Sequence, residues 1–231
     1  MRIMTFNTQH CLGYIKQKID FQLMADVMKK FNPDIVGLNE MRGKGVDKEY
    51  EDQTGILASL TGFEHYCFAK AIDVNGENPY GNAFLSRYPI LNVENIMIPD
   101  PEVKGEGYYE TRCIIKAELE GGVTVLVTHF GLNPDEQKNA VDTVTVNLKK
   151  EKCILMGDFN VTPDDAVLIP VRECMKDTAD CFDKPLLSFP SDNPEVKIDY
   201  LFVSRDIEVV FADIPEIVAS DHRPYIADIN I

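Results

Sequence analysis

The amino-acid sequence predicts an α/β fold in which one β-sheet packs on another and helices cover the outside. Composition is the first observation: the 231 residues are 45% hydrophobic and 26% charged, which is ordinary for a globular protein with a sizeable core. The second is a large number of short apolar segments, rich in β-branched and aromatic residues, which are typical of strands. The third is the small number of helical segments between them. Many strands with few helices favour sheet-on-sheet packing.

Strands are predicted where apolar residues alternate with polar ones or run together between turn-forming residues. Residues 34–39 follow Pro33 and have the apolar character of a buried strand. Gly121-Gly122 stands between two candidates and is a strong hairpin signal. In chain order the predicted strands are residues 2–8, 34–39, 64–69, 82–86, 90–98, 111–119, 123–130, 153–157, 198–203, 207–211 and 225–229.

Helices are predicted in three places. Residues 20–31 have apolar side chains at helical spacing and two lysines in the last turn. Residues 53–60 form a shorter candidate, and residues 134–148 follow Asn133, a favourable N-cap with proline at the first helical position. Because no repeat, low-complexity block or linker divides the chain, we expect residues 1–231 to form a single domain.

The charge balance limits the classes of partner. Lys and Arg number 23 and Asp and Glu number 38, so the net charge of −15 argues against wrapping nucleic acid without regard to sequence. A local basic or metal-filled cleft is compatible with this charge. No apolar run predicts a membrane span, and the first residues lack the apolar core of a signal peptide. The six cysteines form no Cys-x-x-Cys pair, so we expect reduced thiols in a cytoplasmic protein, although their even number leaves disulfides open.

Polar residues of the kind that bind metal or phosphate stand repeatedly at the ends of the predicted strands. A buried carboxylate is unfavourable by several kcal/mol unless it is paired or bound to a metal. Strand ends at one edge of a sheet converge, so we expect these side chains to share a cleft. They are Asn7, Glu40, His129, Asp158, Asn160, Asp199, Asp221 and His222.

The chemistry of this set favours a hard cation. Carboxylate and amide oxygens with histidine suit Mg²⁺ or Mn²⁺ better than Zn²⁺, and the sequence has neither an HExxH motif nor a paired-cysteine site. A Walker loop, GxGxxG and GxSxG are also absent. Nucleotide hydrolysis at a P-loop, dinucleotide redox chemistry and serine hydrolysis therefore lose their usual signals.

An ordered set of motifs covers nearly the whole chain: TFN, NE, GNAFLSRYP, TH, GDFN, IDYLFVS and SDH. In this set the chain resembles the endonuclease/exonuclease/phosphatase superfamily of metal-dependent phosphodiesterases. Phe6 replaces the tryptophan usual in the first motif, and Asn39 replaces the usual glutamine before the glutamate. The resemblance implies a deoxyribonuclease-like, four-layer α/β sandwich of two packed mixed β-sheets flanked by helices.

The resemblance also implies roles for the metal-binding and water-activating residues. Glu40 would be the principal Mg²⁺ ligand, with Asn7 beside it and Asp221 completing or supporting the metal site. Asp158 would orient or deprotonate the attacking water. Asn160 would hold that water or a phosphate oxygen. Hydrolysis of a phosphodiester needs this activation together with charge neutralisation on the phosphoryl oxygens, which Mg²⁺ supplies as a Lewis acid.

A pair of histidines completes the implied catalytic set. Asp199 would bond to the ring of His222, which would face the scissile phosphate with a group that titrates near neutrality. His129 would form a hydrogen bond to phosphate. Asn82 stands where the deoxyribonuclease has a carboxylate beside this histidine. Asn82 would orient His129, but it would stabilise the protonated form of His129 less well than a carboxylate does.

Substrate contacts are implied for Tyr80, Asn82, Arg112 and Arg42. We therefore expect a Mg²⁺-dependent, monomeric phosphoesterase in which a metal-assisted water attacks a phosphodiester in line. The net charge and compact length favour a small or lipid-derived phosphoester as substrate. A nuclease is the alternative, and it would need a positive groove that combines Arg42 and Arg112 with Lys70 and Arg87. A catalytically inactive binding module on the same scaffold is a further alternative.

Overall fold

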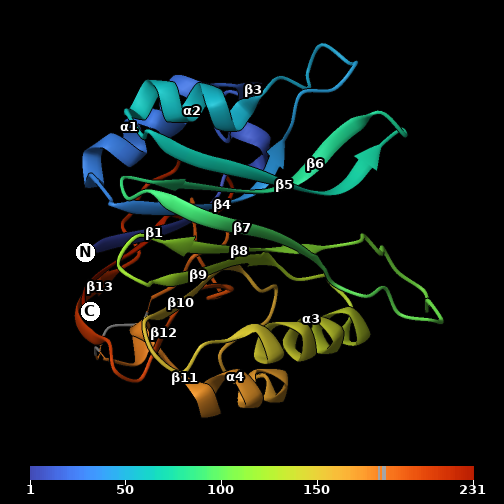
Figure 1. The fold of residues 1–231 in the computed structure, drawn as a ribbon. Coiled ribbons are helices and arrows are strands. Elements are labelled where there is room, and N and C mark those ends of the chain that lie inside the picture. The colour runs from blue at the N-terminus through green and yellow to red at the C-terminus, as the bar shows by residue number, and fades with distance from the viewer. Residues whose placement is uncertain (182, 184–185) are drawn as a thin grey trace.

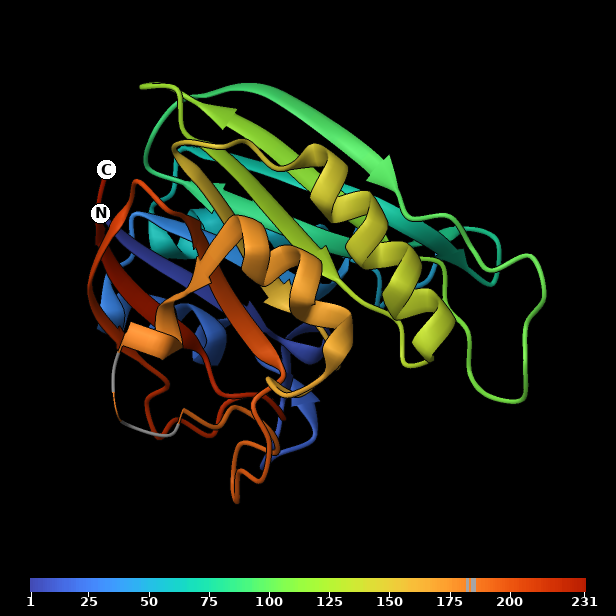
Figure 2. The ribbon, with the colours of Figure 1, turned by 90° about the horizontal axis from the view of Figure 1, so that it is seen from below.

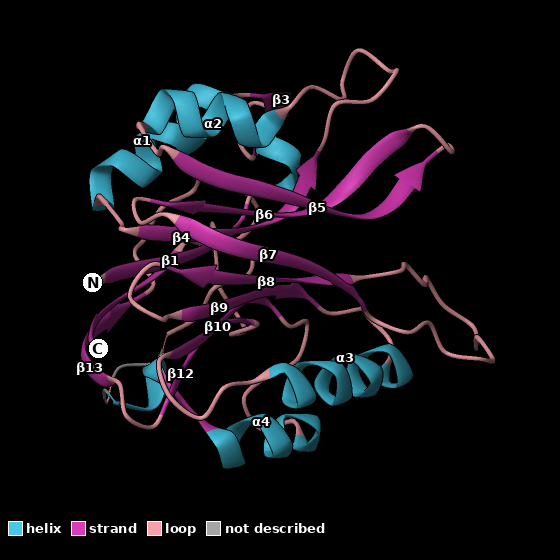
Figure 3. Ribbon diagram, in the orientation of Figure 1, coloured by secondary structure: helices cyan, strands magenta, loops and turns pink. Residues whose placement is uncertain are grey.

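In the computed structural model, two β-sheets pack face to face and helices cover both outer faces (Figure 1). The four layers are visible in Figure 3, with helices above the upper sheet and below the lower one. The structure describes residues 1–181, 183 and 186–231. The four-layer α/β sandwich predicted from the sequence is thus confirmed.

The first sheet has six strands in the order β13-β14-β1-β4-β6-β5. Its centre is the parallel pair β1 and β4, in which Asn7 lies opposite Asn39. The other neighbours in this sheet are antiparallel. The strands are β1 (Arg2–Asn7), β4 (Ile35–Arg42), β5 (His65–Val74), β6 (Asn78–Ser86), β13 (Glu208–Asp213) and β14 (Tyr225–Asn230).

The second sheet also has six strands, in the order β11-β12-β10-β9-β8-β7. It too has one parallel pair at its centre, β9 and β10, in which His129 lies opposite Asp158. On the other side of β10, Asp158 lies opposite Asp199 of the antiparallel strand β12. The strands are β7 (Ile90–Met97), β8 (Cys113–Leu119), β9 (Thr124–His129), β10 (Cys153–Asp158), β11 (Met175–Asp177) and β12 (Asp199–Ser204).

Helices α1 (Phe21–Phe31) and α2 (Gln53–Thr61) cover the first sheet, and α3 (Pro134–Asn147) and α4 (Ile169–Cys174) cover the second (Figures 1 and 2). The helix predicted at residues 134–148 forms because Asn133 and Glu136 make a capping box. The short helix α4, strand β11 and the hairpin of β2 (Leu12–Gly13) and β3 (Lys18–Ile19) were not predicted. They span only two to six residues, too few to show a periodic pattern.

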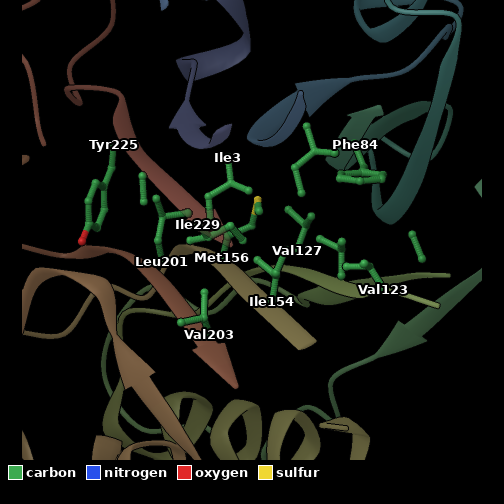
Figure 4. Close-up of a cluster of buried hydrophobic side chains, with 14 of the residues drawn as sticks. Ile3, Phe84, Val123, Val127, Ile154, Met156, Leu201, Val203, Tyr225 and Ile229 are labelled. Atoms are coloured by element: carbon green, nitrogen blue, oxygen red, sulfur yellow. The ribbon is translucent and has the colours of Figure 1, made fainter. Parts of the chain in front are cut away.

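Apolar side chains from both sheets interlock between them (Figure 4). Ile3 and Phe84 of the first sheet meet Val127, Ile154 and Met156 of the second. The sheets approach closely at Gly37, where an added Cβ would lie 2.6 Å from the sulfur of Met156. Burial of this apolar surface is the main favourable contribution to the fold.

The two parallel pairs determine where the functional side chains lie. Asn7 ends β1 and Glu40 lies two residues before the end of β4, while His129 and Asp158 end β9 and β10 in the other sheet. Because the sheets are packed face to face, these four ends lie together at one edge of the sandwich. All six cysteines are free thiols, and no described helix has the length and apolar character needed to cross a membrane.

Candidate active site

Glu40 is presented by an irregularity in β4. The pairing of β4 with β6 shifts register between Leu38 and Met41, and the backbone of Glu40 adopts a left-handed conformation with φ of 60°. Such a conformation is uncommon for a residue other than glycine and is often found at functional sites. The half-buried carboxylate of Glu40 faces the cleft described below. Burial raises its pKa above the usual value, although the hydrogen bond from Asn7 opposes the shift.

Asn7 holds two carboxylates together. Its Nδ2 donates hydrogen bonds of 3.0 Å to Oε1 of Glu40 and to Oδ2 of Asp158. Its own Oδ1 accepts the backbone N–H of Gln9. In this arrangement Asn7 is a donor that joins a carboxylate from each sheet.

Asp158 lies at the centre of the site and is 1% exposed. Its Oδ2 lies 3.5 Å from Nε2 of His129 and 3.6 Å from Nε2 of His222, and its Oδ1 accepts the N–H of Asn160. Burial raises the pKa of this carboxyl, while the neighbouring His222 partly offsets the shift. Asp158 is therefore a stronger base than an ordinary aspartate.

His222 and Asp199 form a buried pair. Nδ1 of His222 lies 2.8 Å from Oδ2 of Asp199, so the ring donates this proton and turns Nε2 toward Asp158. Burial alone would lower the pKa of His222, but Asp199 and Asp158 outweigh it and raise the pKa above the usual value. The ring of Phe189 packs against that of His222 with centroids 4.8 Å apart.

His129 is held in a different electrostatic state. Its Nδ1 lies 3.1 Å from Nη1 of Arg112, which can only donate, so Nδ1 is the acceptor. Its Nε2 lies 3.2 Å from the side-chain nitrogen of Asn160. Burial, with a further contribution from Arg112, lowers the pKa of His129 well below its usual value. The ring is therefore neutral, which suits hydrogen bonding to phosphate better than general-acid catalysis.

Asn82 does not orient His129, contrary to the expectation from the sequence. It is 2% exposed, and its side chain accepts a hydrogen bond from Asn39 at 2.8 Å and donates one to the carbonyl of Cys113 at 2.9 Å. The residues beside the His129 ring nitrogens are Arg112, Asn160 and Asp158. Asn82 lies beneath the site, and the cleft lining does not include it.

A cleft of about 450 Å³ opens over these groups. Tyr80, predicted as a substrate contact, lies in its wall, where burial and the nearby Glu40 raise the tyrosine pKa. Arg112 also lies in the wall and forms an ion pair with Glu110. Tyr108 donates a hydrogen bond of 2.8 Å to the other oxygen of Glu110. The complete lining is Glu40, Tyr80, Tyr108, Glu110, Arg112, His129, Leu132, Asp158, Asn160, Phe189, Ile198 and His222.

Several lining residues were not predicted from the sequence. Tyr108, Glu110, Leu132 and Ile198 lie in loops or beside strands, and no motif marks them. Glu110 can be identified as a cleft residue only from the structure, because the ion pair that places it beside Arg112 forms in the folded chain.

Arg42, the other predicted substrate contact, lies outside the lining. It pairs with Glu49 at 3.4 Å and stacks over the ring of Tyr50, in the loop that follows β4. Asp221 is half-buried near Glu40, and its Oδ1 accepts the hydroxyl of Ser220 at 2.9 Å.

The donor set fits a divalent cation. Ligand atoms of Asp158, Asp199 and His222 lie within 4.8 Å of one another, and Glu40 is linked to Asp158 through Asn7. Oδ1 of Asp199 is buried and has no hydrogen-bond partner among the described residues. The raised pKa values of Glu40 and Asp158 and the unpaired oxygen of Asp199 favour a bound cation that would compensate the negative charge.

The fold and the site define a two-sheet α/β sandwich with a candidate cation-binding cleft at one edge. The chain belongs to the endonuclease/exonuclease/phosphatase family, whose family model matches residues 4–222. No curated protein gives a significant sequence match.

Solved structures share the fold at low sequence identity. An endonuclease/exonuclease/phosphatase from Beutenbergia cavernae is 22% identical with a TM-score of 0.81, over 100% of this chain and 71% of that one. A mannosyl-6-phosphatase from Bacteroides thetaiotaomicron is 16% identical with a TM-score of 0.76, and an AP endonuclease from Archaeoglobus fulgidus is 15% identical with a TM-score of 0.71. Each of these two matches covers 100% of this chain and 100% of the other chain. At these identities the likeness establishes the fold alone.

Proposed function

We propose that the protein is a Mg²⁺-dependent phosphoesterase that hydrolyses a phosphodiester by in-line attack of water. One observation carries this proposal: the His222–Asp199 pair turns Nε2 of His222 toward Asp158, beside Glu40, at the base of one cleft. This combines a cationic imidazole, a basic carboxylate and a cation-binding set in a single place. Membership of the family supports a hydrolase.

Glu40, with Asp221 in support, would hold the cation, and Asn7 would hold Glu40 and Asp158 in place. A bound Mg²⁺ supplies Lewis acidity and orients the phosphate; Mn²⁺ offers the same ligand preference. Asp158, whose pKa burial raises, is suited to orient the attacking water and to accept its proton. The oxygen of that water forms the new bond to phosphorus while the bond to the leaving oxygen breaks.

His222, Asn160 and Arg112 would act on the phosphoryl group. The raised pKa of His222 keeps the ring protonated at neutral pH, so its Nε2–H can stabilise charge on a phosphoryl or leaving oxygen. Asn160 presents its side-chain amide beside His129, where a water or phosphate oxygen would be held. Arg112 reaches the same wall of the cleft.

A small or lipid-derived phosphoester is the substrate class that the cleft supports best. Arg112 is paired with Glu110, and Leu132, Phe189 and Ile198 give the opening an apolar part. A phosphate with a compact or partly apolar leaving group would match this lining, which offers no row of free cations for a polyanion.

A nuclease is the second candidate, and among the described residues the basic groove it would need does not form. Lys70 pairs with Asp73, Arg87 bonds to Asn32 and to the carbonyl of Pro33, and Arg42 pairs with Glu49. Each of these cations is engaged by a side chain or a backbone carbonyl, and none of them lines the cleft. An AP endonuclease and a mannosyl-6-phosphatase both share the fold, so the fold itself favours neither class.

The experiment is a comparison of substrates with and without divalent cation. Hydrolysis of a chromogenic phosphodiester, of phospholipid headgroups and of supercoiled DNA would be measured for the wild type, His222→Ala and Glu40→Ala. We expect Mg²⁺-dependent turnover of the first two and a loss of roughly 10²–10⁴ in rate for His222→Ala. Nicking of DNA at low enzyme concentration, abolished in both variants, would favour the nuclease. An absence of turnover with every substrate and cation would favour the inactive binding module.

The free cysteines support the cytoplasm as the compartment.

A further inference from the structure

Ser188 is a fully buried serine that lies outside the cleft and precedes β12 by eleven residues. Its hydroxyl oxygen accepts two backbone hydrogen bonds, from the N–H of Ile198 at 3.2 Å and from the N–H of Asp199 at 3.3 Å. A serine oxygen has two lone pairs, so one side chain can satisfy both amides. The backbone that carries Asp199 is thus fixed to Ser188.

The same short segment is bonded to the loop that carries His222. The carbonyl of Ser188 accepts the N–H of Arg223 at 2.8 Å, and the N–H of Ser191 donates to the carbonyl of Asp221 at 2.7 Å. The hydroxyl of Ser191 donates to the carbonyl of Ser220 at 2.6 Å. The residues on both sides of His222 are therefore held by residues 188–191.

Strand pairing alone does not hold the Asp199 end of β12 on both sides. On one side β10 pairs with Asp199–Val203, but on the other side β11 reaches only Phe202–Ser204. Where β11 does not reach, the hydroxyl of Ser188 accepts the amides of Ile198 and Asp199. Phe189, the next residue, packs its ring on His222.

We propose that Ser188 is a positioning residue for the Asp199–His222 pair. The inference rests on the proposed function, since it assigns Ser188 a part in the same site. Ser188 lines no part of the cleft and acts through backbone bonds on either side of the pair. Its loss would leave two amides without an acceptor and let the 2.8 Å contact between Asp199 and His222 lengthen or become disordered.

Three variants and one matched control test this proposal. Ser188→Ala removes the acceptor, Ser188→Cys keeps the volume with a weaker acceptor, and Ser188→Thr keeps the hydroxyl. The control is Ser204→Ala, at the opposite end of β12, where a buried serine hydroxyl likewise accepts a backbone N–H, from Cys153 at 3.0 Å. Two readouts are needed: kcat and KM on a chromogenic phosphodiester with Mg²⁺, and the NMR signal of the His222 Nδ1 proton in protein with ¹⁵N-labelled histidine.

We expect Ser188→Ala to lower kcat by roughly tenfold to a hundredfold with little change in KM, because misplacement of a reacting group costs rate rather than binding. The Nδ1 proton signal broadens or disappears in the same variant. Ser188→Thr recovers both readouts, Ser188→Cys is intermediate, and Ser204→Ala matches the wild type in both.

Two results would overturn the proposal. One is an unchanged kcat and Nδ1 signal in both Ser188→Ala and Ser188→Cys. The other is an equal loss in Ser204→Ala, which would mean that any buried serine in this strand acts through general stability. If Ser188→Ala fails to fold, Ser188→Cys and Ser188→Thr decide the matter. If the wild type hydrolyses no phosphoester, the proposed function fails, while the NMR signal still decides whether Ser188 positions the pair.

Discussion

The side-chain oxygen of Asn39 in β4 accepts the backbone N–H of Asp158 in β10 at 3.0 Å, so a hydrogen bond joins the two sheets directly beneath the candidate active site. The amide nitrogen of Asn39 also donates to the carbonyl of Thr128 in β9 at 2.8 Å. A third bond, to Asn82, ties it to β6 within its own sheet. Asn39 is fully buried and every one of these bonds is shielded from water.

Replacement of Asn39 by alanine is expected to destabilise the protein by about 2–4 kcal/mol, because buried partners on three strands lose their bonds together. Urea unfolding of Asn39→Ala measures the change. Asn139→Ala is the matched control, since Asn139 is half-buried and also donates to a backbone carbonyl, that of Pro99, but in a bond exposed to water. Equal stability of the two variants would show that the bond between the sheets contributes nothing of its own.

Asn39 also illustrates what could be predicted from the sequence. The strands that carry Asn7, Glu40, His129 and Asp158 at or near their ends were predicted because each apolar run stops at a polar residue. A pattern along one strand tells which residue ends it, but it does not tell which layer the side chain enters. Asn82 therefore lies below the site, bonded to Asn39, and not beside His129 as expected.

Elements that depend on distant partners were the hardest to predict. Helix α3 carries its own capping box and was predicted to within one residue at its end. Strand β11 has three residues and exists because it pairs with β12, to which no local pattern points. Glu110 in the cleft is of the same kind, since its place depends on Arg112 and Tyr108 rather than on a motif.

The buried lysine Lys197 gives a prediction for stability against pH. Its Nζ lies 2.9 Å from Oδ2 of Asp177 and 3.3 Å from the centre of the Tyr200 ring. Burial lowers the pKa of Lys197 to about 8, and the attraction of Asp177 only partly opposes this. In the unfolded chain the pKa returns to about 10.5. Between these values the unfolded state binds more protons, so the free energy of unfolding rises with pH.

At full effect the difference between the two pKa values is worth roughly 3 kcal/mol. Urea unfolding of the wild type and of Lys197→Met at about pH 7 and about pH 10 isolates the contribution of this lysine. We expect the wild type to gain stability relative to the variant as the pH rises. Lys138→Met, which removes an exposed lysine in α3, serves as control. A difference between wild type and Lys197→Met that stays constant with pH would contradict the prediction.

The ion pair between Glu110 and Arg112 predicts a competition for the arginine. A phosphate that contacts Arg112 must displace the carboxylate of Glu110, whose side chain is only 12% exposed. Glu110→Gln should therefore lower the inhibition constant of inorganic phosphate by roughly fivefold to tenfold, which corresponds to about 1 kcal/mol. Inhibition of phosphodiester hydrolysis measures it, with Glu106→Gln in the same loop as control. Equal inhibition constants in all three proteins would mean that Arg112 does not contact the phosphate.

Glu40 gives the last prediction, which concerns the cation itself. The carboxylate faces the cleft from a half-buried position with a raised pKa, so its charge is unfavourable until a cation neutralises it. In the wild type, Mg²⁺ at about a hundred times its dissociation constant should stabilise the fold by about 2.7 kcal/mol. Glu40→Gln should abolish this gain while keeping, or slightly raising, the stability of the metal-free protein, because it removes an uncompensated charge without changing the shape of the side chain.

Thermal unfolding with and without Mg²⁺, after treatment with a chelator, separates the two effects. Glu49→Gln is the matched control, because Glu49 lies in the loop that follows β4 and its side chain is 76% exposed. We expect the melting temperature of this control to rise with Mg²⁺ as in the wild type, and that of Glu40→Gln to stay where it is without the metal. A rise of the same size in Glu40→Gln would remove Glu40 from the cation site and leave the buried carboxylates of Asp158 and Asp199 to hold the metal.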